Sequence, residues 1–330
     1  MNELFDYGYD PHFYGLPAEG EISARVISVH RELYGIVCAR GEGKARLKSS
    51  AYRTEHNSLY PTIGDFVSLR WNDSGDSVIT RTMPRKSYFA RSDSFSARGT
   101  QAIAANIDYA LLASSLNSDF NLRRLERYLA QTMESGAAPV FVLTKADLCP
   151  DPTVYISQLR AIAPEVPVHA VSAHTGFGMD ELAPYLTAGT TLVMLGMSGV
   201  GKSSLLNALM GYERMAVNRT RDIDPAKGRH TTTHRELIRL PTGALLIDTP
   251  GMRELGVWDA QDGVMQAFAD IDALAAQCRF SDCTHTREPG CAVQAALASG
   301  ALDPRRYKNY LDLLSQAKQT ARIASKRRRR

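Results

Sequence analysis

The pattern of hydrophobic and polar positions changes along this chain of 330 residues. Between residues 21 and 83, short runs alternate apolar and polar side chains, and turns rich in Gly, Asn and Asp separate them. Such runs are typical of a small all-β barrel, because successive side chains of a strand point to opposite faces. They occupy residues 24–29, 34–38, 65–71 and 77–80. Residues 1–19 show no period, and we expect a flexible N-terminal extension there.

From about residue 107 the pattern becomes an alternation of strands and helices. Asn121 can cap a helix and Gly136 can end it. One face of that helix carries Leu122, Leu125, Leu129 and Met133. Continuous apolar runs, typical of buried parallel strands, occupy residues 107–113, 140–143, 166–171, 192–195 and 244–247. This alternation predicts a doubly wound α/β domain with ligand loops at the carboxyl ends of its strands.

The chain is longer than one core usually allows, so two or three domains are expected. After residue 258 it becomes Ala-rich and helical around a Cys/His cluster. We therefore predict a multidomain protein. It combines an oligonucleotide-binding (OB-fold) β-barrel over residues 20–95, an α/β domain over residues 96–258, and a small helical domain with a basic tail over residues 259–330.

Basic and aromatic side chains in the barrel stretch favour RNA binding, and a barrel used only for packing is the alternative. The basic candidates are Arg46, Lys48, Arg53, Arg70, Arg81, Arg85, Lys86 and Arg91, and the stacking candidates are Trp71, Tyr88 and Phe89.

A glycine-rich loop after the apolar run at residues 192–195 matches G-x-x-x-x-G-K-[ST] in full. It consists of Gly196, Met197, Ser198, Gly199, Val200, Gly201, Lys202 and Ser203, and Ser204 continues into the helix that follows. Glycines let backbone N–H groups wrap phosphates, and the helix N-terminus adds positive potential. We expect Lys202 to reach the β- and γ-phosphates and Ser203 to hold Mg²⁺.

Two further segments are expected near the phosphates. Asp248 and Gly251 follow the apolar run at residues 244–247. Asp248 can organise Mg²⁺ through its water shell, and the Gly251 N–H can sense the γ-phosphate. The polar residues 228–234 suit a switch loop, and among their three adjacent threonines we favour Thr232 as a Mg²⁺ ligand.

A base-reading motif, Thr144-Lys145-Ala146-Asp147, ends the run at residues 140–143. The Asp147 carboxylate can accept hydrogen bonds from guanine N1–H and N2–H, and the Lys145 stem can pack on the base. Adenine lacks that donor pair, so GTP and GDP are the expected ligands. Ser172-Ala173, after the next strand, is placed for a backbone N–H to meet guanine O6.

Three of the five cysteines lie close together in the C-terminal segment. Cys278, Cys283, His285 and Cys291 form a Cys₃His set, which is common in closed, structural zinc sites. Few large apolar residues surround it, so metal can contribute the folding free energy that the core lacks. The alternative is a set of reduced, buried cysteines.

The order of the nucleotide motifs is rotated, because the base-reading motif precedes the phosphate loop instead of following it. With a barrel in front, a Cys/His cluster behind and Arg229-His230-Thr231-Thr232-Thr233 between, the chain resembles the circularly permuted, ribosome small-subunit-dependent GTPase family (RsgA/YjeQ) over roughly residues 20–300. The resemblance implies a ribosome-stimulated GTPase that binds the 30S subunit and 16S rRNA in late small-subunit maturation. Thr144 departs from the Asn that most GTPases carry there.

Met252 follows Gly251, where Ras-like enzymes place a glutamine that orients water. A thioether cannot do this, so intrinsic hydrolysis should be slow. His230 is the candidate for that role, and we expect Lys202 and Thr232 to be catalytic as well. The alternative is that His230 contacts only RNA or solvent.

The charge is uneven. Net charge is +4, yet residues 305–330 hold ten Lys/Arg and one acid, so they carry +9 and the rest carries −5. Such a tail suits phosphate backbones, or is only a solvated end. No apolar run reaches transmembrane length, and we expect a cytoplasmic monomer without a membrane partner. Two other functions stay open: a GTPase acting on another RNA such as tRNA, and a nucleotide-gated RNA-binding clamp with little hydrolysis.

Overall fold

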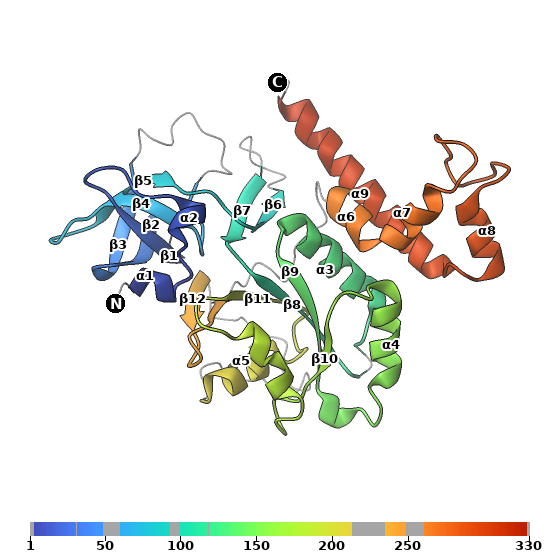
Figure 1. The fold of residues 1–330 in the computed structure, drawn as a ribbon, viewed down its shortest axis with the longest axis horizontal. Helices are drawn as coiled ribbons and strands as arrows, with labels where there is room; N and C mark the ends of the chain where they lie inside the picture. Colours follow the sequence, from blue (N-terminus) through green and yellow to red (C-terminus); the bar gives the residue numbers. More distant parts are fainter. Residues whose placement is uncertain are drawn as a thin grey trace, which may run out of the picture.

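The computed structural model describes residues 3–30, 32–48, 60–92, 100–117, 119–212, 235–248 and 261–328. Figure 1 shows the barrel strands and the C-terminal helices on opposite sides of an α/β sheet.

Five strands close into the barrel: β1 (Ile22–His30), β2 (Leu33–Cys38), β3 (Gly41–Leu47), β4 (Phe66–Arg70) and β5 (Ser77–Thr82). They pair in the order β1-β2-β3-β5-β4, and β4 pairs again with β1. Val26, Ile36 and Ile79 fill the interior and are fully buried. The predicted β-barrel is therefore confirmed.

Strand β3 was not predicted from the sequence. This strand has few large apolar residues. At Gly43 a Cβ would lie only 2.9 Å from Cη2 of the Trp71 ring, so a larger residue would collide with that ring. The residues that pack on this strand come from elsewhere in the chain, so β3 itself carries little hydrophobic signal.

The α/β sheet has five parallel strands: β8 (Tyr109–Ser115), β9 (Ala138–Thr144), β10 (Val168–Ala170), β11 (Thr191–Leu195) and β13 (Leu245–Asp248). Their spatial order is β10-β9-β8-β11-β13, followed by antiparallel β12 (Arg235–Arg239). The chain runs outward from β8 to β10 and then returns to β11 beside β8. Ligands bind at such a switch point, outside the carboxyl ends of the strands.

Helix α3 (Leu122–Ser135) matches the predicted helix and both its caps. The Asn121 side chain accepts a hydrogen bond from the Arg124 N–H at 3.0 Å, and Gly136 ends the helix with φ 81°. The other elements of this domain are α4 (Thr153–Ile162), α5 (Lys202–Met210) and the short helices η2 (Ala146–Leu148) and η3 (Met179–Tyr185).

The barrel and the α/β sheet share backbone hydrogen bonds. Strands β1 and β12 pair antiparallel through Ser28↔Glu236 and Val29↔Arg235, which makes one sheet of 11 strands within the described ranges. A two-stranded sheet of β6 (Tyr88–Ser92) and β7 (Thr100–Ala105) links the barrel to β8 along the chain.

Arg25 lies at this junction with only 1% of its surface exposed. Its guanidinium donates hydrogen bonds to the carbonyl oxygens of Gly64 and Asn106 at 3.2 Å and to the Thr191 hydroxyl at 2.9 Å. Burial lowers the pKa of Arg25 to about 10. These partners come from the barrel, the linker and the α/β domain, so Arg25 fixes their relative position.

The N-terminal segment is not the flexible lead-in that the sequence indicates. It forms α1 (Glu3–Asp6) and α2 (Pro11–Tyr14). Leu4, Tyr9 and Tyr14 are buried against Phe66 and Met83 of the barrel. The prediction failed because this packing depends on partners distant in the sequence, which local periodicity cannot reveal.

The C-terminal helices are α6 (Gln261–Ala267), α7 (Ala269–Ala275), α8 (Ala292–Ser299) and α9 (Pro304–Arg328). Helix α6 packs closely on α3 at Gly263, where a Cβ would lie 2.2 Å from the Ala130 carbonyl oxygen. Arg306 of α9 donates to Glu126 of α3 at 2.5 Å and to Asp270 at 2.6 Å. None of the helices in the described ranges combines the length and apolar character that a bilayer span requires.

Candidate nucleotide site and metal cluster

The phosphate loop connects β11 to the N-terminus of α5. Gly199 and Gly201 have φ of 83° and 102°, a conformation that disfavours other residues. A Cβ at Gly196 would lie 2.7 Å from the Ala113 carbonyl oxygen. These three glycines therefore let the loop turn tightly against the end of β8.

The Lys202 ammonium is directed into this loop. Its Nζ lies 2.6 Å from the carbonyl oxygens of both Gly196 and Met197. Ser203 and Ser204 occupy the first turn of α5 and are half-buried. Ser198 and Val200 complete the loop, with Val200 buried. The helix N-terminus and the lysine thus meet at the loop where a phosphate can bind.

Two residues of the base-reading motif hold the phosphate loop. The Thr144 hydroxyl donates to the Val200 carbonyl oxygen and also lies 3.3 Å from the Ser114 carbonyl oxygen. Lys145 donates from Nζ to the Gly199 carbonyl oxygen at 2.8 Å, and its backbone is left-handed with φ 59°. The two motifs, far apart in the sequence, form one connected structure.

Asp147 is held by Ser172. The Ser172 hydroxyl donates to Asp147 Oδ1 at 2.6 Å, while its own oxygen accepts from the backbone N–H groups of His174, at 3.3 Å, and Thr175, at 3.2 Å. These donors leave the hydroxyl hydrogen for the carboxylate. The Ala146 N–H also donates to the Val171 carbonyl oxygen at 3.1 Å, which joins the two base-side loops.

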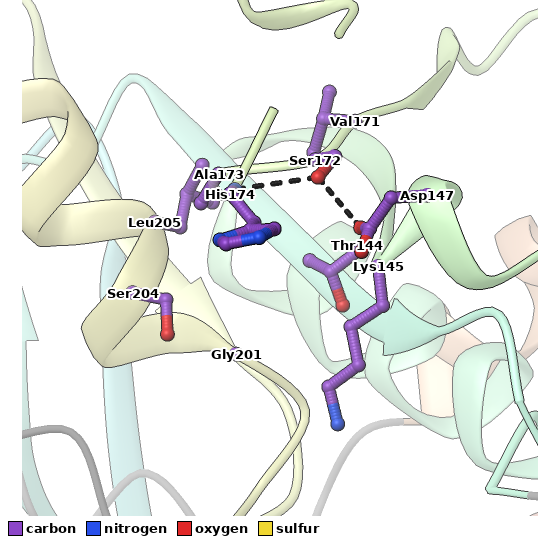
Figure 2. A pocket seen from close by; sticks show the side chains of 10 residues that line it. All are labelled: Thr144, Lys145, Asp147, Val171, Ser172, Ala173, His174, Gly201, Ser204 and Leu205. Atoms are coloured by element: carbon purple, nitrogen blue, oxygen red, sulfur yellow. Dashed lines mark hydrogen bonds between the residues drawn. The ribbon is translucent and has the colours of Figure 1, made fainter. Parts of the chain in front are cut away.

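An open pocket lies between these loops and α5 (Figure 2). Its lining residues are Thr144, Lys145, Asp147, Val171, Ser172, Ala173, His174, Gly201, Ser204 and Leu205. The structure therefore brings both predicted base-side segments to the phosphate loop. His174 was missed in the sequence, although its position directly after Ser172-Ala173 was an available signal.

Part of the predicted phosphate side cannot be placed. Asp248 is the last residue of β13, and this strand lies directly beside β11, which precedes the phosphate loop. Gly251, Met252, His230 and Thr232 lie outside the described residues. Nothing in the described geometry bears on their predicted roles.

The Cys/His cluster is assembled in space. Ligand atoms of Cys278, Cys283, His285 and Cys291 all lie within 4.8 Å of one another. The Cys278 and Cys291 sulfurs are 3.8 Å apart, and each is 3.5 Å from His285 Nδ1. Tetrahedral zinc, with Zn–S of about 2.3 Å and Zn–N of about 2.0 Å, requires edges of about 3.8 Å and about 3.5 Å. The donor set and its spacing fit zinc.

The loop that carries the cluster is shaped by hydrogen bonds and by an unusual backbone conformation. His285 has φ 56°, and Gln294 of α8 donates to its carbonyl oxygen at 2.5 Å. Glu288 accepts from the backbone N–H groups of Thr284 and Thr286, both at 2.9 Å. Hydrogen bonds from Thr284 and its neighbours lower the pKa of Glu288. The histidine is thereby aimed at the three sulfurs.

Several basic and aromatic barrel residues are not available for RNA in the way the sequence suggests. Arg85 forms an ion pair with buried Asp65 at 2.7 Å, and its side chain is 11% exposed. Arg46 pairs with Asp76 at 2.6 Å. Phe89 is buried in the hydrophobic core, whereas Tyr88 is exposed. Arg85 and Phe89 are therefore largely inaccessible, because ion pairing and burial are invisible in composition, whereas the Arg46 side chain is 57% exposed and remains accessible.

A phosphate loop that follows an inner strand of a parallel sheet, with its base-side loops on strands that come earlier in the chain, defines a circularly permuted GTPase. The RsgA GTPase family matches residues 82–258. The small ribosomal subunit biogenesis GTPase RsgA of Streptomyces avermitilis is 47% identical over 340 residues, covering 99% of this chain and 90% of that protein. RsgA 1 of Listeria monocytogenes is 47% identical over 289 residues, covering 88% of this chain and 82% of that protein.

Comparison with solved structures leads to the same fold. The crystal structure of YjeQ from Thermotoga maritima has a TM-score of 0.65 and 26% identity, over 89% of this chain and 98% of that one. YloQ, described as a circularly permuted GTPase, has a TM-score of 0.62 at 23% identity and supports the fold, over 94% of this chain and 98% of that one. The chain belongs to the RsgA GTPase family. It is accordingly a GTP-hydrolysing enzyme that binds guanine nucleotides.

Proposed function

We propose that this protein hydrolyses GTP on the 30S ribosomal subunit, as a step in late small-subunit maturation. The proposal rests above all on the hydrogen bonds that join the base-side loops to the phosphate loop, within a permuted GTPase fold. Relatives that cover nearly the whole chain are named small ribosomal subunit biogenesis GTPases, and this supports the small subunit as partner.

The residues of the pocket have separate roles in this proposal. Asp147, oriented by Ser172, accepts hydrogen bonds from the guanine edge, and the Ala173 N–H meets guanine O6. The Lys145 stem packs on the base. Lys202 exchanges the two carbonyl oxygens it now contacts for β- and γ-phosphate oxygens, where its charge stabilises the transferring phosphoryl group.

Ser203, Thr232 and Asp248 are proposed to hold Mg²⁺, Thr232 and Asp248 from the switch side. The metal would neutralise charge that develops on the phosphates. Gly251 senses the γ-phosphate, and His230 orients the attacking water because Met252 cannot. This part of the proposal rests on the sequence order of the motifs.

The remaining parts of the chain are proposed to recognise 16S rRNA. The barrel over residues 20–95 and the basic end of the helical domain over residues 259–330 supply positive charge on both sides of the GTPase domain in sequence, residues 96–258. Cys278, Cys283, His285 and Cys291 would bind one structural zinc. The protein would act in the cytoplasm as a monomer.

The rate of GTP hydrolysis tests this function directly. It is measured for the protein alone and with 30S subunits, 50S subunits or tRNA. We expect a large increase with 30S only. An increase with tRNA instead would indicate another RNA substrate, and no increase with any of them would indicate a nucleotide-gated clamp.

A further inference from the structure

His174 lines the nucleotide pocket but has no part in the roles assigned above. Figure 2 shows its imidazole ring pointing into the pocket, between α5 and the loop that carries Asp147. Within the described part of the chain, no hydrogen bond or ion pair involves the ring, and the residue is exposed. A flat aromatic ring is therefore presented to the ligand space.

The backbone around His174 is fixed even though the ring is exposed. Its N–H donates to the Ser172 hydroxyl oxygen at 3.3 Å. The Gly176 N–H donates to the Ser172 carbonyl oxygen at 2.9 Å, and the Ser172 N–H donates to the Phe177 carbonyl oxygen at 2.8 Å. This closed turn sets the ring's position relative to Asp147, because Ser172 also holds that carboxylate at 2.6 Å.

Different groups of the pocket must contact the edge and the two faces of a bound base. Asp147 can pair only with an edge, so the faces of a bound purine must meet other groups that line the pocket. An imidazole ring offers a flat π surface, and rings of this kind stack on bases with little regard to base identity. Ser204 and Leu205 of α5 line the same side of the pocket but have no such surface.

We propose that His174 stacks on the guanine base and strengthens nucleotide binding without reading the base edge. The inference rests on the guanine site proposed above, and it assigns affinity to His174 and selectivity to Asp147. Stacking acts equally on bound substrate and on the transition state. It therefore lowers KM and leaves kcat at saturating GTP unchanged.

Three variants distinguish stacking from other roles. His174→Ala removes the ring, His174→Phe keeps a flat ring without nitrogen, and His174→Gln keeps polar atoms without a ring. Calorimetry with GDP should show that the Ala and Gln variants bind about fivefold more weakly or worse, while the Phe variant stays near wild type. KM for GTP should rise in parallel, with kcat retained.

Phe177→Ala is the matched control, because this exposed aromatic belongs to the same turn but does not line the pocket. It should keep wild-type affinity. Unchanged GDP binding by His174→Ala would overturn the proposal, as would rescue by Gln with failure of Phe, or an equal loss in Phe177→Ala. Wild-type preference for GDP over ADP is measured alongside. Its absence would refute the guanine site itself, whereas its presence with an inert His174→Ala would refute only the stacking.

Discussion

Thr144 illustrates how one short side chain joins two loops. Its hydroxyl contacts the carbonyl oxygens of Ser114 and Val200, and the residue is only 4% exposed. The longer asparagine of most GTPases is therefore not required for this link. A base-side strand and the phosphate loop are held together by a group that itself need not touch the nucleotide.

Asp147→Asn should shift preference from guanosine toward xanthosine nucleotides. The amide presents a donor where the carboxylate accepted, and xanthine offers an oxygen at that edge. Sites built on paired polar groups discriminate by roughly 10⁴-fold, so the change in relative affinity should be large. Competition between GDP and XDP for each protein measures it. If the variant retains full GDP affinity, Asp147 does not read the base.

At the scale of elements, the contact between α9 and α3 depends on a buried ion pair. The Arg306 and Glu126 side chains are 8% and 2% exposed. Burial raises the pKa of Glu126, and Arg306 opposes that rise. Asn309 of α9 also donates to Glu126 at 2.5 Å. The helical domain is thus fixed to the GTPase domain by charge as well as by packing.

Arg306→Met should lower the free energy of unfolding by about 3–5 kcal/mol at neutral pH, because Glu126 is left charged and buried. Without Arg306 the folded-state pKa of Glu126 rises further above its unfolded value. The loss should then be smallest below the unfolded pKa and grow as pH rises through the folded pKa. Chemical denaturation at several pH values measures this.

Two controls accompany that experiment. Arg305→Met changes an exposed neighbour and should cost little. Arg306→Met combined with Glu126→Gln should recover part of the stability and remove the pH dependence. If the single Arg306 variant loses stability independently of pH, packing and not charge explains the contact.

The Cys₃His loop should bind one zinc per chain. Cys283→Ser should lose it and loosen the C-terminal helices, because this loop has few apolar contacts of its own. GDP binding should largely survive, since one face of the α/β sheet has a core that the C-terminal helices do not share. Elemental analysis and limited proteolysis measure both effects. Cys149→Ser, outside the cluster, should keep the metal, and a metal-free protein with folded C-terminal helices would contradict the assignment.

At the scale of the whole molecule, deletion of residues 326–330 should weaken binding to 30S subunits. Five positive charges are removed, so the dependence of affinity on salt should become less steep. Intrinsic GTP hydrolysis should not change, because the described residues that line the pocket all lie between Thr144 and Leu205. Binding titrations at several salt concentrations test this, and an identical slope would show that the tail makes no phosphate contact.

The sequence predicts those features that depend on neighbouring residues. The Asn121 and Gly136 caps, the buried parallel strands and the loop before Lys202 all follow from local spacing, and the structure has the helix and strands at these places. The Cys/His cluster can be predicted for the same reason, since all four ligands lie in one short segment of the chain, between Cys278 and Cys291.

Features that depend on distant partners were missed. Tyr9 and Tyr14 pack against Phe66, which is about fifty residues away in the chain, and the pairing of Arg85 with Asp65 has no local signature. The ladder between β1 and β12 joins segments about two hundred residues apart. Neither composition nor periodicity encodes which strand edges will meet.

That ladder restricts how this architecture can be altered. A barrel joined to the α/β domain only by a linker could be exchanged for the barrel of another protein, because it would fold as an independent domain. Here the replacement must also present a strand whose register matches β12 at Glu236 and Arg235, and that strand must carry an arginine equivalent to Arg25 that reaches Thr191. The barrel and the nucleotide-binding domain are therefore expected to have diverged together, and chimaeras between relatives should fold best when the cut falls outside the pair of strands.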